Sequence, residues 1–139
     1  MEYKRFGESI IVRLDRGDEI VEQVLAIAKQ EKIHLAEISA LGAVDEFTAG
    51  VFRLSEKKFQ PNHFKGEFEI VSLTGTLSEK DGEPYCHLHM SAGDKDGHVF
   101  GGHLARARIS ATGEMVIRLI DGQVGRRFNE EIGLNLFEF

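Results

Sequence analysis

The sequence predicts an α+β fold, in which one main helix packs on an antiparallel or mixed β-sheet of about seven or eight strands, as a single domain over residues 1–139. Three observations support this expectation. Only one segment shows helical spacing of apolar residues, most of the remaining chain has the short β-branched or alternating runs typical of strands, and Gly-containing turns separate these runs. The 42% hydrophobic and 29% charged residues are typical of a globular chain.

The first two elements are a strand and a helix. Residues 9–14 are apolar and β-branched, which predicts a strand, and Gly17 then breaks the chain. Asp18 is a suitable N-cap for a helix that runs from Glu19 to about Lys32. The apolar positions that recur at helical spacing are Ile20, Val21, Val24, Leu25, Ile27 and Ala28.

The rest of the chain is predicted to form strands joined mostly by hairpins. Gly42 is expected to end one strand, Asp81-Gly82 is a strong hairpin signal, and Gly93–Gly97 provides a second turn. The expected strands are residues 35–41, 47–54, 68–77, 84–92, 98–104, 114–120 and 134–139.

Charge and cysteine content restrict the classes of function. The formal net charge is −6, and the only basic runs are Lys57-Lys58 and Arg126-Arg127, so the balance disfavours DNA as a partner of this chain. The single cysteine, Cys86, fits a reducing compartment. We find no signal peptide and no apolar stretch of about 18 residues, so we expect a cytoplasmic protein that is not inserted in a membrane.

Three histidines are the most informative residues. His87 and His89 alternate with Leu88, so they share one face of a strand. If the turn Gly93–Gly97 is centred on Lys95, His103 lies opposite His87, and Gly101, opposite His89, leaves room for a bound group. A register shift of one residue would instead move His103 to the other face.

Three neutral imidazoles around an open position suit a divalent transition metal, with Zn²⁺ as the first choice. The predicted metal ligands are therefore His87, His89 and His103. The alternative is that these are solvent-facing or hydrogen-bonded histidines without a metal. We expect His34 and His63 to be polar surface residues, and Cys86 to face the core and not the metal.

Several segments resemble, in order, the plant and prokaryote conserved (PPC) domain. They are residues 68–77, Asp81-Gly82, His87-Leu88-His89, Asp96-Gly97 and Gly101-Gly102-His103-Leu104. This resemblance spans nearly the whole chain and implies a stand-alone, prokaryotic-type domain that assembles as a homotrimer with its histidines clustered. The resemblance also implies the description of the family as DNA-binding, which comes from its plant nuclear members. Those members carry a separate AT-hook, Arg-Gly-Arg-Pro, which this sequence does not contain.

Three functions remain open from the sequence. A trimeric metal-binding or regulatory module needs only the histidine cluster and an interface between subunits. A DNA-binding protein would act through the PPC domain without an AT-hook. A metal-dependent enzyme acting on an unidentified small molecule would use the open coordination position, with Glu114 as a candidate general base. The sequence assigns no catalytic residue.

Overall fold

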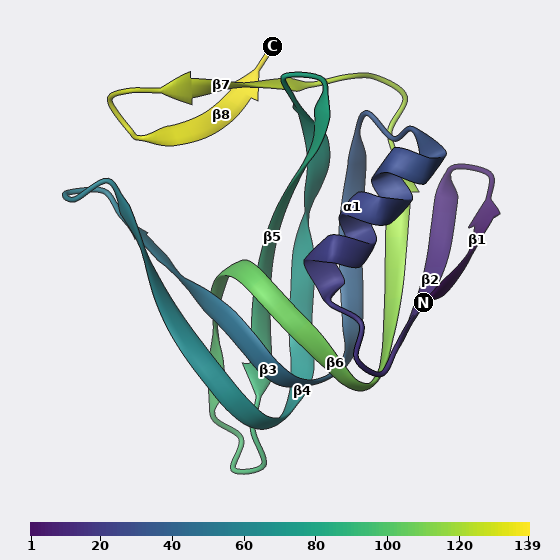
Figure 1. The fold of residues 1–139 in the computed structure, drawn as a ribbon, viewed down its shortest axis with the longest axis vertical. Coiled ribbons are helices and arrows are strands. Elements are labelled where there is room, and N and C mark those ends of the chain that lie inside the picture. Colours follow the sequence, from purple (N-terminus) through teal and green to yellow (C-terminus); the bar gives the residue numbers. More distant parts are fainter.

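Eight strands and one helix follow one another along the chain, and the computed structural model describes all 139 residues (Figure 1). The numbers of strands and helices agree with the sequence-based expectation. The elements are β1 (Glu2–Phe6), β2 (Ser9–Asp15), α1 (Ile20–Glu31), β3 (Ala36–Arg53), β4 (Lys58–Lys80), β5 (Glu83–Gly93), β6 (Val99–Leu119), β7 (Gly125–Asn129) and β8 (Leu134–Glu138).

The strands divide into two sheets, where one sheet was expected. A six-stranded sheet has the order β1-β2-β6-β3-β4-β5, and β7 and β8 form a separate two-stranded sheet. All of the pairings are antiparallel. Strand β6 also pairs with β5, so β3, β4, β5 and β6 close into a ring near the β5–β6 turn. The β7–β8 hairpin lies above the outer end of the β3–β4 hairpin (Figure 1).

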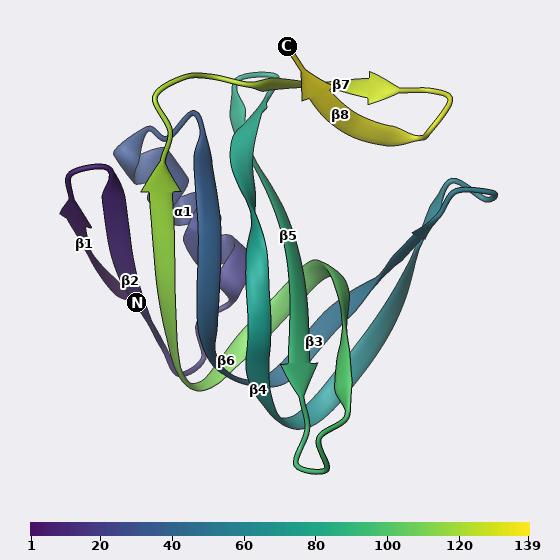
Figure 2. The ribbon, with the colours of Figure 1, turned by 180° about the vertical axis from the view of Figure 1, so that it is seen from behind.

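Helix α1 covers one face of the large sheet, as predicted. Its buried residues, Ile20, Val24, Ile27 and Ala28, join a core of 25 buried hydrophobic side chains. Viewed from behind, β2, β6 and β3 lie in front of the helix, and no element covers that face of the sheet (Figure 2). With 12 residues, α1 is too short to cross a bilayer, and no other helix is present.

The N-cap of α1 is Glu19 and not Asp18. The Glu19 carboxylate accepts a hydrogen bond from the Glu22 backbone N–H at 2.8 Å and another from the Ala107 N–H at 2.8 Å. Asp18 instead accepts from the Asp15 N–H and pairs with the N-terminal amine. The Glu19 side chain is long enough to cap the helix with Oε2 while Oε1 accepts from a backbone N–H on the neighbouring strand β6.

Two long strands replace four of the predicted short ones. The predicted strands 35–41 and 47–54 both fall on β3 apart from their outer ends, residues 35 and 54, and the predicted strands 98–104 and 114–120 both fall on β6 apart from residues 98 and 120. Gly42 does not end β3. It pairs with Gly113 beside a shift in strand register, and a Cβ on Gly42 would lie 2.5 Å from the Thr112 carbonyl oxygen. This glycine therefore permits a bend with close strand contact inside a continuous strand.

Candidate metal centre

Strands β5 and β6 bring the three predicted histidines together. The ring centroids of His87, His89 and His103 are 5.1–5.7 Å apart, and each ring offers a nitrogen within 4.8 Å of the nitrogens of the other two. His89, not His87, is the direct partner of His103, so the expected register was wrong by two residues. A shift of two residues leaves every side chain on its original face, so the histidines still cluster.

The hydrogen bonds of the turn explain the register. The Asp94 carboxylate accepts from the backbone N–H groups of Asp96 and His98, and the Asp94 N–H donates to the His98 carbonyl. The turn therefore consists of residues 94–98, and Gly93 pairs with Val99 as the last residues of the two strands. Such an Asx-type turn has no clear hydrophobic signal, so the sequence does not distinguish it from a turn one residue earlier.

Partial burial makes two of the imidazoles weak bases. Desolvation, followed by the nearby His103 and His89, lowers the pKa of His87 to about 4. Desolvation and His89 also lower the pKa of His103. Both rings are therefore neutral near pH 7, and each keeps a nitrogen lone pair that can bind a metal.

The histidines line a cavity of about 830 Å³. Apolar side chains from the β3–β4 and β7–β8 hairpins form much of its wall, and no Asp or Glu lines it. Its lining consists of Gly50, Val51, Phe52, Phe59, Tyr85, His87, His89, Gly102, His103, Arg126, Leu134, Asn135, Leu136 and Phe137. The two-stranded sheet therefore completes the cavity that the large sheet begins.

Glycines allow the strands beneath this cavity to approach closely. A Cβ on Gly102 would lie 2.4 Å from the Gly50 carbonyl oxygen, and one on Gly101 would lie 2.2 Å from the Met90 carbonyl oxygen. Gly50 and Gly102 line the cavity, whereas Gly101 faces the backbone of β5. The expectation that Gly101 leaves room for a ligand is therefore wrong, because its missing side chain serves strand contact.

Sequence reasoning missed Arg126, the only Lys, Arg, Asp or Glu in the cavity wall. Its Cζ lies 4.5 Å from the centroid of the Tyr85 ring and 4.3 Å from that of Phe137. Its Nε donates to the Ser78 hydroxyl at 2.8 Å, and its Nη1 donates to the Asn135 carbonyl at 2.9 Å. Desolvation lowers the pKa of this guanidinium, although it remains protonated at neutral pH.

The other candidate residues lie apart from this cavity. His34 interacts with Glu79 and His63 with Thr48, as polar residues outside the site. Cys86 packs against the core, and desolvation raises the pKa of its thiol to about 12. Glu114 lies opposite Arg13 and Leu41 and does not line the cavity, so it is not placed to act as a general base there.

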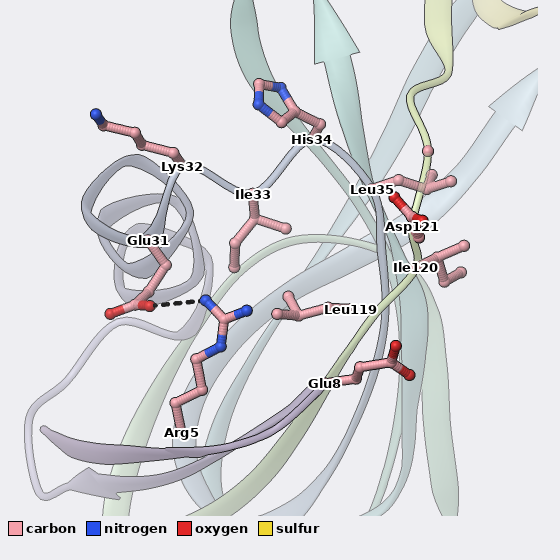
Figure 3. A pocket seen from close by; sticks show the side chains of 11 residues that line it. Arg5, Glu8, Glu31, Lys32, Ile33, His34, Leu35, Leu119, Ile120 and Asp121 are labelled. Carbon is pink, nitrogen blue, oxygen red and sulfur yellow. Dashed lines mark hydrogen bonds and ion pairs between the residues drawn. The ribbon is translucent and has the colours of Figure 1, made fainter.

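Two further features have simpler explanations. Asp94, Asp96 and His98 lie close together, but they belong to the exposed β5–β6 turn and their contacts are those that stabilise it. A pocket of about 260 Å³ lies beside the end of α1, where Arg5 and Glu31 face each other with 3.5 Å between Nη1 and Oε2 (Figure 3). It holds charges of both signs, of which Arg5 and Glu31 pair with each other, and no cluster of metal-ligating side chains.

The fold and the site define a β-rich domain with an open group of three histidines in a half-apolar cavity. The chain belongs to the Plants and Prokaryotes Conserved (PCC) domain family, whose model matches residues 1–121. This is the family that the motifs between Phe68 and Leu104 indicate. The matched residues include all three histidines but end before Arg126 and the β7–β8 hairpin.

Comparison with individual proteins gives the same fold over nearly the full chain. One similar protein, from Bacteroides thetaiotaomicron, has a crystal structure and is provisionally described as DNA-binding. It is 32% identical to this chain, and the two structures superpose with a TM-score of 0.96 over 99% of this chain and 96% of that one. A protein from Archaeoglobus fulgidus, described as metal-containing, is 36% identical with a TM-score of 0.88, covering 99% and 97%.

Similarity also extends to a plant protein. The AT-hook motif nuclear-localized protein 2 of Arabidopsis thaliana is 24% identical over 111 residues, which cover 77% of this chain and 32% of the plant protein. The chain thus spans only about a third of the curated plant relatives that it matches.

Proposed function

We propose that His87, His89 and His103 bind a divalent transition metal, with Zn²⁺ as the first choice, in an open cavity of a PCC domain. The observation that carries this proposal is the convergence of three imidazoles, two of which have lowered pKa values, on one wall of that cavity. The donor set fits the metal, because neutral imidazole nitrogen is a preferred ligand of zinc. The description of the 36% identical Archaeoglobus protein as metal-containing supports the same assignment.

The arrangement favours a binding or reactive site over a purely structural one. Structural zinc sites are usually closed by four protein ligands, whereas here three histidines face a cavity without a carboxylate or thiolate. A metal bound there would supply Lewis acidity to whatever occupies the remaining position. The chain itself would hold the metal through the imidazoles and restrict water through the apolar wall, which includes Phe52 and Phe59. A metal-dependent reaction on a small molecule is therefore an extension of this proposal.

Two further parts of the proposal concern assembly and location. We propose that the domain assembles as a homotrimer, and the uncovered face of the large sheet offers a surface for that contact. The free, poorly ionised thiol of Cys86 suits the reducing environment of the cytoplasm.

DNA binding is the second candidate function, and it rests on the description of the Bacteroides relative. The net charge of −6 opposes it, and Arg126, one member of the basic pair Arg126-Arg127, lines the cavity. If the domain binds DNA through phosphate contacts, affinity for a duplex must fall steeply as salt is raised from about 50 to 200 mM. No binding at the lower concentration would exclude this candidate.

Metal analysis of protein purified without a histidine tag tests the metal site. We expect one Zn²⁺ per chain, and we expect His87→Ala and His103→Ala each to weaken zinc binding by at least about a hundredfold, because each removes one of three ligands. His63→Ala is the matched control, since it removes a histidine outside the cavity and should leave zinc binding unchanged. Equal zinc content in all four proteins, with circular dichroism showing them folded, would refute the site.

A further inference from the structure

The guanidinium of Arg126 has more hydrogen-bond donors than the protein uses. An arginine carries five N–H groups, and the protein accepts from one on Nε and one on Nη1. Nη2 is buried and has no hydrogen-bond partner. An unpaired buried donor is costly, so natural structures usually satisfy such a group with a partner, water or a ligand.

The positive charge of Arg126 also has no acidic partner. Most arginines of the chain form ion pairs, and the adjacent Arg127 is paired with Glu138, yet no Asp or Glu lies within ion-pair distance of Arg126. The rings of Tyr85 and Phe137 stabilise the cation by cation–π contact and fix its orientation. They supply no negative charge. An unneutralised, half-buried cation therefore remains in the cavity wall.

The cavity as a whole favours anions. The chain has 23 acidic residues, but none lines this cavity, while the arginine Arg126 does. The remaining wall is mostly aromatic and aliphatic, with Val51, Phe52, Phe59 and Leu134 among its side chains. This combination matches a ligand with one charged end and one apolar end.

We propose that the cavity binds a small organic oxyanion, a carboxylate or phosphate on an apolar body, whose charged group is received by Arg126. The planar fork of arginine suits both kinds of group. This inference deepens the proposed function and rests on it in one respect, since a metal on the histidines would add positive charge to the same cavity. It concerns a residue outside the segment that the family model matches.

Isothermal titration calorimetry at low ionic strength tests the inference with 3-phenylpropionate, phenyl phosphate and the neutral 3-phenylpropionamide. Both anions should bind at least about tenfold more tightly than the amide, and the tighter of the two identifies the preferred group. Inorganic phosphate, which lacks the apolar body, should bind more weakly than phenyl phosphate. Equal affinity for the acid and its amide, or no binding of either anion at millimolar concentration, would overturn the inference.

Variants of the two neighbouring arginines locate the charge that is responsible. Arg126→Met should weaken anion binding at least about tenfold, Arg126→Lys should weaken it less, and Arg127→Met should leave it unchanged, because Arg127 is exposed and paired with Glu138. The Nε resonance of Arg126 in the unaltered protein should also shift when an anion is added, which does not depend on how a variant folds. Unchanged affinity in folded Arg126→Met and an unmoved resonance would refute the role of Arg126.

Repeating the titrations with His103→Ala separates this inference from the metal proposal. If His103→Ala loses zinc but its anion binding still depends on Arg126, the anion site does not need the metal. If the original protein binds zinc but does not prefer the anions to the neutral amide, the metal site stands and the anion site is refuted.

Discussion

At the scale of single residues, strand alternation determines the chemistry on each side of β5. Leu88 and Met90 are buried in the core, while His87 and His89 line the cavity on the opposite face. This division could be predicted from the sequence because the period of two is a property of any strand. The exact partner of His103 could not, since it depends on where the β5–β6 turn begins.

The same alternation places Cys86 on the core side, and this leads to a prediction about its thiol. Burial raises its pKa to about 12, so at pH 8 the thiolate fraction is very small. We expect Ellman's reagent to label the native protein at least about tenfold more slowly than the protein in urea. Native labelling as fast as in urea would show that the thiol is accessible and ionisable.

The raised pKa also fixes a pH dependence of stability. The folded state keeps the thiol proton up to about pH 12, whereas an unfolded chain loses it near pH 9, so the stabilisation is present below pH 9 and is lost as pH rises toward 12. Between these pH values, the contribution of Cys86 to the free energy of unfolding should fall by up to about 1.4 kcal/mol for each pH unit. The difference between the original protein and Cys86→Ala in urea denaturation at pH 8 to 10.5 measures it. A difference independent of pH would contradict the assignment.

At the scale of elements, glycines were the main source of error in the sequence analysis. The helix was predicted well because its apolar spacing is long and regular. Gly42 suggested a chain break, but it lies opposite Gly113 within a continuous strand, where the backbones approach too closely for side chains. The sequence cannot distinguish a glycine that ends a strand from one that permits contact, because the neighbouring backbone is supplied by a distant segment.

Gly102 provides a test of this role in β6. Both Gly102 and Gly97 have positive φ, so alanine strains the backbone at either site, but a Cβ meets nothing within 4 Å at Gly97 and lies 2.4 Å from the Gly50 oxygen at Gly102. We expect Gly97→Ala to cost about 1 kcal/mol of unfolding free energy and Gly102→Ala about 3 kcal/mol or more. Urea denaturation measures both. Equal costs would mean that strand contact at Gly102 contributes nothing.

At the scale of the whole molecule, the cavity depends on how two sheets meet. The sequence indicated the histidines because two neighbouring strands supply them. It did not indicate Arg126, because that residue reaches the cavity through the β7–β8 hairpin, whose position is set by contacts such as that of Arg126 with Ser78 on β4. A basic pair, Arg126-Arg127, was visible in the sequence, but nothing local showed that one member lines the cavity and the other pairs with Glu138.

The uncovered face of the large sheet makes the oligomeric state testable. Ile11 and Val116 are register partners on that face, and with Leu41 they leave an aliphatic surface exposed opposite the helix. Small domains gain buried apolar area by assembling, so light scattering after gel filtration should give three times the chain mass of 15.6 kDa. Ile11→Asp with Val116→Asp should reduce the mass to that of one chain, because each buried carboxylate would lack a partner.

Leu54→Asp is the matched control for this double variant. Leu54 is an exposed aliphatic residue in the turn between β3 and β4, so a charge there should leave the mass at three chains. If the original protein has the mass of a single chain at micromolar concentration, the trimer is refuted. If it is a trimer that survives the double variant, the subunits meet elsewhere, and the aliphatic face of β2 and β6 is not their interface.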